Sequence, residues 1–566
     1  MAGADDPRRV WAAAIAGAAT MFAVQPPLDV WWLAWLAPLP WLALVAAPEL
    51  PGSRPWLAIW VGGFAHWLLA IHWLRLPHPA TGLGWVALSA YLGLYVPLFI
   101  WGARRLVHAR GWPLVPAAVA AWMATEQVRG SLLGGFTFAM LGHTQWRWTA
   151  VLQVADAVGE VGVGGIVMGI AAAAAVAGQA AGGRRPVAWI QPLGAVAVLA
   201  AAVAYGHWRL RTAPVPAGRP LDVLLVQGSI DTELKHDPAA SADVARHYDD
   251  LTMLGLAAAD GRPPDLVVWP ETMWRWALLE IDPSVTLAEH VVEELVGPDA
   301  ADGVDRQARC RELLERERLD PLSAHARRYA TRWLVGVDRQ VVNPRAAGGV
   351  EHHNCGLFLE STGEPLACYS KMHPVMFGEY VPLADSFPFL YRITPLPASL
   401  TAGTEPVAVP VAGYEVAPTI CYETALPGAI RSLVRRLAAS GSRPDVIVNL
   451  TNDGWFWGSS ELDMHLTAAI FRAVEVRTPI AIAANTGFSA AIDGSGRLLA
   501  RGPRRAAAPL RVAVSRDGRR SPWLAWGSLP IWACVTVVAA MTLAPGRAGA
   551  ARGRLGGDPP AGGAPA

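Results

Sequence analysis

Three side chains with complementary chemistry follow short apolar runs in the 566-residue sequence. The carboxyl group of Glu271 follows Leu-Val-Val-Trp-Pro, the ammonium group of Lys371 follows Cys-Tyr-Ser, and the thiol of Cys421 follows Ala-Pro-Thr-Ile. A thiolate attacks carbonyl groups, a carboxylate can accept the thiol proton, and an ammonium group stabilises the resulting oxyanion. Singly, each residue fits a structural role better; together they predict covalent acyl chemistry.

The region around these residues, 208–520, has the pattern of an α/β domain. Apolar β-type runs recur at 221–226, 265–269, 333–337, 356–360, 416–421, 445–449 and 480–484, and helix-like segments fall between several of them, at 239–258, 427–439 and 465–477. Alternating strands and helices predict a layered α/β domain whose site lies at the carboxyl ends of the strands. We therefore expect the three residues to end strands and to converge. The charged stretch 282–318 has weak periodicity and is interpreted as an insertion.

The first 207 residues have the composition of a membrane segment. The whole chain is 53% hydrophobic and 16% charged, whereas soluble domains have about a quarter charged residues. Runs long enough to cross a bilayer lie at 10–24, 31–47, 56–74, 82–101, 113–128, 161–180 and 187–205, and an eighth lies at 523–543. The first run lacks a signal-peptide cleavage site, so we interpret it as a retained helix. The predicted organisation is a seven-helix bundle (1–207), a catalytic domain (208–520), an eighth helix (521–545) and a disordered tail (546–566).

The arginine distribution orients this bundle. One side carries Arg8, Arg9, Arg54, Arg104, Arg105, Arg110, Arg184, Arg185, Arg547, Arg552 and Arg554. The other side carries only Arg75, Arg129 and Arg147. The positive-inside rule therefore predicts that both termini are cytoplasmic and that residues 208–520 lie outside the cytoplasm.

Composition also excludes several classes of function. The net charge of +1 gives no sign of nucleic-acid binding, and five cysteines are too few for a disulfide scaffold. No His/Cys cluster has metal-ligand spacing, so we expect neither a metal nor a cofactor. Cys355 and Cys368 flank a predicted hairpin turn at 361–364, so they either form a disulfide or are small apolar side chains. Only Lys235 and Lys371 are lysines among 47 basic residues, which favours a specific role for a retained lysine as a compact charge.

Several motifs resemble the apolipoprotein N-acyltransferase family, a membrane-embedded branch of the nitrilase (carbon–nitrogen hydrolase) superfamily. Trp-Pro-Glu-Thr around Glu271, Tyr-Ser-Lys-Met-His around Lys371 and Ile-Cys-Tyr-Glu around Cys421 resemble the Glu-Lys-Cys triad of that superfamily. Further similar segments are 226–230, 377–382, 449–456, 465–475, 484–487 and the Glu-x-x-Arg helix end at 126–129. The resemblance covers nearly the whole chain, and the triad together with the helix layout distinguishes this family.

The resemblance implies an α-β-β-α sandwich and a two-step acyl transfer at the periplasmic side of a bacterial inner membrane. Cys421 would take an acyl chain from a phospholipid, expected to be phosphatidylethanolamine, as a thioester. The amino group of a diacylglyceryl-cysteine at the N-terminus of an apolipoprotein would then attack it, which completes lipoprotein maturation. Glu271 would accept the protons, and Lys371 with backbone N–H groups near Tyr422 would hold the oxyanion. The family resemblance also implies a monomer.

Supporting residues follow from the same resemblance. Glu379 is expected to orient Lys371, and Glu423 is either a second site carboxylate or an exposed turn residue. Aromatic residues beside the site either contact lipid or pack within the domain: Trp274, Trp276, Trp455, Phe456 and Trp457. The sequence departs from the family at 456–460 and in the stretch 282–318, which leaves the preference for an acyl donor open.

Two other functions fit parts of the sequence. A membrane-tethered amidase or nitrilase would share the triad but transfer the acyl group to water, and such a tether needs one helix, not eight. A catalytically inactive scaffold with the nitrilase fold would not need an intact triad. Glu126 and Arg129 either help the bundle to bind lipid headgroups or mark a helix end at the membrane interface.

Overall fold

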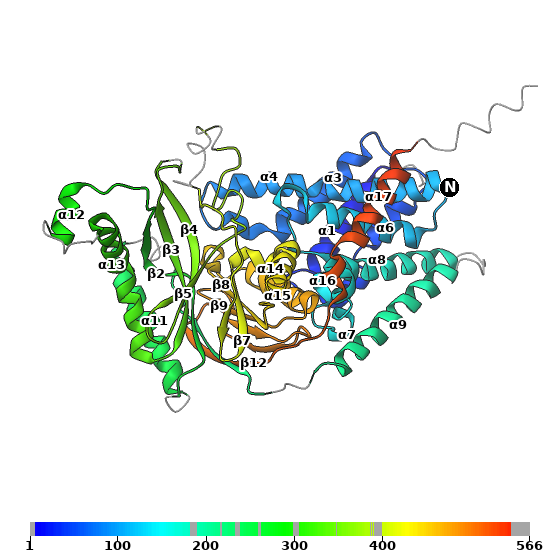
Figure 1. Ribbon diagram of the computed structural model, residues 1–566. Coiled ribbons are helices and arrows are strands. Elements are labelled where there is room, and N and C mark those ends of the chain that lie inside the picture. Colours follow the sequence, from blue (N-terminus) through cyan, green and yellow to red (C-terminus); the bar gives the residue numbers. More distant parts are fainter. Residues whose placement is uncertain are drawn as a thin grey trace, which may run out of the picture.

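The computed structural model describes residues 6–181, 189–214, 218–231, 238–258, 262–297, 305–346, 348–384, 387, 389 and 399–544. The predicted tail at 546–566 therefore lies outside the described residues. A helical half and an α/β half lie side by side, and the chain starts in the helical half (Figure 1).

The helical half is built from apolar helices of very different lengths. They are α1 (Arg8–Ala23), α2 (Leu39–Ala46), α3 (Pro55–Ala70), α4 (Thr81–Gly93), α5 (Tyr95–Arg104), α6 (Leu114–Arg129), α7 (Thr149–Leu152), α8 (Ala155–Ala181), α9 (Ile190–Arg211), α16 (Pro522–Trp526) and α17 (Leu529–Leu543). Helix α6 packs against α5, α8 and α17, so the C-terminal helix joins the N-terminal bundle. The bundle core includes Trp41, Phe99, Ile100 and Trp122.

Length and composition identify three segments of the described chain that could cross a membrane: Thr81–Ala109, Ala155–Gln179 and Ile190–Arg211. Shorter apolar helices are Trp31–Ala46, Pro55–Ala70 and Leu529–Leu543. Helices α1 and α6, which arise from two other predicted runs, have 16 residues each, whereas about 20 are typical of a span. The count of eight spans therefore stays a prediction.

The α/β half contains two six-stranded sheets. The first has the order β12-β1-β2-β3-β4-β5 and the second has the order β11-β10-β9-β8-β7-β6. The first comprises β1 (Leu221–Gln227), β2 (Leu266–Ile281), β3 (Arg332–Val342), β4 (Val350–Leu359), β5 (Pro365–Ser370) and β12 (Ala508–Val514). The second comprises β6 (Val409–Val411), β7 (Tyr414–Ile420), β8 (Val446–Thr451), β9 (Ile480–Ala484), β10 (Ala490–Ile492) and β11 (Leu498–Arg501).

Four layers result from packing on both faces of each sheet. Val268 and Leu334 of the first sheet meet Val416 and Val448 of the second in a shared core. Helices α11 (Ser241–Ala257) and α13 (Arg306–Tyr329) cover the outer face of the first sheet. Helices α14 (Pro427–Ala439) and α15 (Glu461–Val476) cover the second sheet and face the helical half (Figure 1). This is the predicted α-β-β-α order. Both faces of a strand such as β8 are covered, which explains why every residue of that strand is buried.

Two predictions about this half are corrected. Strand β2 does not end at Glu271 but continues to Ile281 after a shift in its register with β3 between Trp269 and Trp274. The stretch 282–318 is not a single insertion, because it contains α12 (Glu289–Val296) and the first half of α13. Helix α13 packs on β2 through a narrow stripe that includes Leu322 and Ala326. Because this helix carries many charged residues, its apolar stripe is not evident from the sequence.

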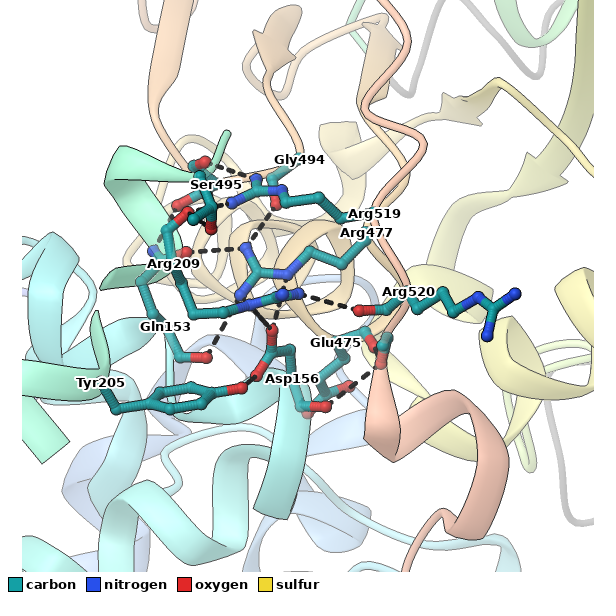
Figure 2. Close-up of polar contacts among 12 residues, drawn as sticks. Gln153, Asp156, Tyr205, Arg209, Glu475, Arg477, Gly494, Ser495, Arg519 and Arg520 are labelled. Carbon is teal, nitrogen blue, oxygen red and sulfur yellow. Dashed lines mark hydrogen bonds and ion pairs between the residues drawn. The ribbon is translucent and has the colours of Figure 1, made fainter. Parts of the chain in front are cut away.

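Buried ion pairs join the two halves (Figure 2). Asp156 of α8 accepts hydrogen bonds from Tyr205 and Arg209 of α9, at 2.6 and 2.7 Å, and from Nε of Arg477, which follows α15, at 2.8 Å. The guanidinium group of Arg477 also donates to Gln153 at 2.7 Å. A second buried pair links Arg472 of α15 to Glu160 of α8 at 2.6 Å. Charged contacts therefore fix the α/β half onto the helices.

Replacing Asp156 should destabilise the whole protein. Asp156→Ala leaves the guanidinium groups of Arg209 and Arg477 buried without their shared carboxylate, which should lower the free energy of unfolding by about 3–5 kcal/mol. Thermal unfolding in detergent measures this. Glu405→Gln is the control, because the Arg436–Glu405 pair is exposed and such pairs contribute little. Equal midpoints for the two variants would contradict the structural role of Asp156.

Candidate active site

The three predicted chemical residues converge between the two sheets. Lys371 directly follows β5, and Cys421 directly follows β7 and begins the 3-10 helix η9 (Cys421–Ala425). Glu271 lies in β2 where the register shifts. The Lys371 Nζ atom is 3.5 Å from Oε1 of Glu271, and the charges of both groups act on the Cys421 thiol. The structure thus places a carboxylate, an ammonium group and a thiol in one site.

The carboxylate of Glu271 is buried and held at both oxygens. Asn354 Nδ2 donates to its Oε1 at 2.6 Å, and the backbone N–H of Asn452 donates to its Oε2 at 3.0 Å. The neighbouring Thr272 has φ of 54°, a left-handed conformation that costs about 1–3 kcal/mol. Gly336 on β3 permits this geometry, because a Cβ there would lie 2.2 Å from the carbonyl oxygen of Pro270. The local backbone is therefore shaped around one carboxylate.

Lys371 carries a fully buried ammonium group between two carboxylates. Its Nζ is 2.6 Å from Oε1 of Glu379, and the side chain is 1% exposed. Burial opposes the charged form, but the negative charges of Glu379 and Glu271 outweigh it and raise the pKa of Lys371 above its ordinary value. Oε2 of Glu379 accepts the N–H of Val375 at 2.7 Å. Glu379 therefore lies where it can orient Lys371, as the resemblance implied.

Cys421 begins a strained turn directly after β7. Its φ is 52°, a strained conformation for a residue with a side chain. Its carbonyl oxygen accepts from Thr424 Oγ1 at 3.1 Å and from Asn449 Nδ2 at 3.2 Å, and His465 Nε2 lies 3.2 Å away. Burial raises the pKa of the Cys421 thiol well above its ordinary value, Glu271 acts in the same direction, and Lys371 opposes both. The resting thiol is therefore protonated at neutral pH, and attack requires a base.

Glu423 is a buried bridge between the two strand ends, so the exposed-turn alternative is wrong. It is 1% exposed, and its carboxylate accepts from the N–H groups of Ile420 at 2.7 Å and Met372 at 2.8 Å. The hydroxyl of Tyr369 donates to both of its oxygens at 2.8 Å. Because Ile420 precedes Cys421 and Met372 follows Lys371, Glu423 fixes the nucleophile and the ammonium group relative to each other.

The aromatic candidates divide into buried and exposed groups. Trp274 is 2% exposed and packs in the core under α13, so it is not a lipid contact; it lies in β2 and not on a loop. Trp276 is partly buried, with its ring centroid 4.9 Å from that of Trp274. Phe456 and Trp455 are partly buried, and Trp457 is half exposed. Trp457 therefore has the greatest exposure of these five.

The helical half contributes an aromatic wall that the sequence did not reveal. Tyr422, next to the nucleophile, packs against Phe138 with ring centroids 5.6 Å apart and donates to the carbonyl oxygen of Gly135 at 3.2 Å. The ring of Phe456 packs against that of Trp73, with the centroids 4.9 Å apart. Phe138 and Trp73 are distant in sequence from the triad, and no motif links them to it. The site is thus lined by both halves of the chain.

The structure also groups three residues near Cys421 that the sequence analysis did not connect. Asp453, Glu461 and His465 form a buried cluster. The predicted helix at 465–477 begins after Glu461, whereas α15 starts at Glu461 and places it one turn before His465 on the same helix face. Cys355 and Cys368 both have free thiols, and the register places them opposite Ser370 and Leu357, not opposite each other.

Comparison with known families first defines the class of protein. Residues 225–520 match the model of the carbon–nitrogen hydrolase family, and residues 16–173 match that of the apolipoprotein N-acyltransferase N-terminal domain. The α/β half with its two sheets is thus a nitrilase-like domain.

Curated relatives then give the particular family. The apolipoprotein N-acyltransferase of Azotobacter vinelandii is 31% identical over 533 residues, 92% of each chain. That of Rhodopirellula baltica is 29% identical over 547 residues, 92% of this chain and 94% of the relative. A solved amidase from Nesterenkonia sp. is 17% identical and covers 54% of this chain and 95% of its own, with a TM-score of 0.34. The chain belongs to the apolipoprotein N-acyltransferase family and is a membrane protein and acyltransferase by that relationship.

The protonated resting thiol predicts a characteristic pH dependence of alkylation. Because the pKa of Cys421 is raised, its thiolate fraction and its labelling rate with iodoacetamide should rise about tenfold per pH unit from about pH 7 to 9 without levelling off. Lys371→Met removes the charge that lowers this pKa, so labelling should be slower at each pH. Peptide mass spectrometry of the Cys421 peptide measures both rates. A plateau below about pH 8 would show a resting thiolate and contradict this state of the site.

Glu423→Gln should loosen the link between the two strand ends. The amide presents one acceptor oxygen where the carboxylate has two, so at least one buried donor loses its partner and the free energy of unfolding should fall by about 1–3 kcal/mol. Thermal unfolding measures this loss, and iodoacetamide labelling of Cys421 reports the position of the nucleophile. If stability and labelling both equal those of the exposed Glu405→Gln control, the bridge has no structural role.

Proposed function

We propose that this protein N-acylates the N-terminal diacylglyceryl-cysteine of apolipoproteins by a ping-pong reaction with a phospholipid acyl donor. One observation carries the proposal: Cys421 lies in a strained turn between a buried Glu–Lys–Glu cluster and an aromatic wall supplied by the apolar helical half. The first feature suits acyl chemistry, and the second suits a lipid substrate. The names of the family's members support the same reaction.

The first step forms the acyl-enzyme. Glu271 accepts the proton of the Cys421 thiol as Sγ attacks the ester carbonyl carbon of the phospholipid. Lys371 and backbone N–H groups near Tyr422 donate hydrogen bonds to the oxyanion. The tetrahedral intermediate collapses, the ester C–O bond breaks, and Glu271 returns its proton to the leaving oxygen of the lysophospholipid. A thioester on Cys421 remains.

The second step transfers the acyl chain to the lipoprotein. The α-amino group of the diacylglyceryl-cysteine attacks the thioester carbonyl carbon, and Glu271 accepts an amine proton. The same donors hold the second oxyanion. The C–S bond breaks, an amide forms, and Cys421 regains a proton. Glu271, Lys371 and Cys421 thus act in both half-reactions, and Glu379 and Glu423 position them.

The membrane arrangement is part of the proposal. Residues 1–207 form seven transmembrane helices and 521–545 an eighth, and both termini lie in the cytoplasm of a bacterial inner membrane. Residues 208–520 then face the periplasm, and phosphatidylethanolamine is the expected donor. The arginine distribution along the chain supports this orientation. The enzyme acts as a monomer with the bilayer and the diacylated apolipoprotein as its partners.

Intact-protein mass spectrometry tests the first half-reaction. Purified protein mixed with phosphatidylethanolamine should gain the mass of one acyl chain, and hydroxylamine should remove it. Cys421→Ala should gain none, whereas Cys368→Ala, a control cysteine outside the site, should behave as wild type. Glu271→Gln should slow acylation by about 10²–10⁴-fold because the base is lost. No acyl-enzyme in wild type, with none in Glu271→Gln, would contradict the phospholipid donor.

A diacylated lipopeptide tests the second half-reaction. When it is added to the acyl-enzyme, the extra mass should disappear and a triacylated lipopeptide should form. An amidase with the same three residues would instead release free fatty acid to water. Fatty acid without triacylated product would therefore contradict the transferase assignment and support the hydrolase.

A further inference from the structure

Three titratable side chains lie beside the nucleophile without a role in the proposed reaction. Asp453 begins the short helix η10 (Asp453–Phe456), and Glu461 and His465 lie one turn apart on α15. One ligand atom of each lies within 4.8 Å of the others. All three are buried, with 3%, 3% and 5% of their surfaces exposed.

Among the described residues, His465 is the one basic group that faces the two carboxylates of this cluster. Neither Asp453 nor Glu461 forms an ion pair with an arginine or lysine of the described ranges. Oε2 of Glu461 is buried and has no hydrogen-bond partner in the described chain. The nearby Asp463, in contrast, pairs with Arg504. Buried carboxylates are normally paired or bound to a metal ion, and Oε2 of Glu461 has neither kind of partner among the described residues.

The spacing of the three groups suits a metal ion. His465 Nδ1 is 3.1 Å from Oδ1 of Asp453 and 3.9 Å from Oε1 of Glu461. Ligands bound at about 2.0–2.2 Å from one cation are separated by about 3–4 Å. When both carboxylates are ionised and the imidazole is neutral, the three groups carry two negative charges, which a divalent cation balances. One imidazole with two carboxylates suits Zn²⁺ or Mn²⁺.

The surrounding hydrogen bonds resemble those of a metal-bound histidine. The second ring nitrogen, Nε2 of His465, lies 3.2 Å from the carbonyl oxygen of Cys421 and 3.0 Å from Oγ1 of Thr424. Oδ1 of Asp453 accepts the hydroxyl of Thr451 at 2.8 Å. A ligating histidine typically donates its other N–H to a carbonyl oxygen, and a ligating carboxylate is itself hydrogen-bonded.

We propose that Asp453, Glu461 and His465 bind a divalent transition-metal ion, Zn²⁺ or Mn²⁺, close to the backbone of Cys421. The ion takes Nδ1 of His465 as a ligand, which leaves the proton on Nε2 and directs it to the Cys421 carbonyl oxygen. The ion is structural: it holds the strained turn at Cys421 and contacts no reacting atom.

Metal content of the resting protein tests this directly. Full-length protein with a histidine-free affinity tag is purified in detergent, incubated with Zn²⁺ or Mn²⁺, freed of unbound ions and analysed by elemental mass spectrometry. Wild type should retain about one ion per chain. Glu461→Gln and Asp453→Asn should lower retention by about tenfold or more, whereas the control Asp463→Asn, on the same helix, should retain the ion.

Chelation gives a second measurement that needs no variant. Removal of the ion should lower the thermal midpoint of wild type, and adding Zn²⁺ or Mn²⁺ back should restore it. Failure of wild type to retain either ion would overturn the proposal; His465 would then carry both protons and pair with Asp453. Equal retention in wild type and Glu461→Gln would also overturn it, because the ion would lie elsewhere. Neither result depends on substrate, so both are separate from the acyl-transfer experiments.

Discussion

The active site depends on one buried ammonium group held between two carboxylates. Lys371 contacts Glu379 at 2.6 Å and Glu271 at 3.5 Å, and its neighbouring backbone is bound to Glu423. A buried charge is costly unless it is paired, so each member of this cluster requires the others. In the proposed reaction this arrangement gives Cys421 a proton acceptor, Glu271, and an oxyanion donor, Lys371. It also explains why an arginine-rich sequence retains a lysine here. The guanidinium group of an arginine is larger and planar, so it would not replace the compact ammonium donor of Lys371.

The remaining structure holds strained and charged groups in place. Thr272 and Cys421 both have left-handed backbones, which persist only because their surroundings fix them. Arg472 links this site to the helices, since it donates to the carbonyl oxygen of Ala425 at 3.2 Å, in the turn that Cys421 begins, and pairs with Glu160 of α8. The nucleophile is thereby positioned relative to the apolar half as well as to its own domain. The contacts of Arg472 that position the turn at Cys421 are therefore also contacts between the two halves.

The sequence predicts the local features of this protein better than its tertiary ones. Strand β9 and helix α14 were predicted with the observed bounds, and Cys421 and Lys371 do follow strands, because apolar runs and turn residues determine these elements. Helix α13 was missed since its charged surface conceals a narrow buried stripe. The burial of Trp274 and Glu423 depends on partners from distant segments. No periodicity in the chain encodes those contacts.

The ionisation of Lys371 is the most direct test of the central claim. In the Lys235→Arg variant Lys371 is the sole lysine, so ε-¹³C-lysine labelling gives one signal from the full-length protein in detergent. Because Glu379 and Glu271 raise the pKa of Lys371, this signal should not shift between about pH 8 and 11. A titration centred near the ordinary lysine value of about 10.4 would show an ammonium group free of both carboxylates and would contradict the account.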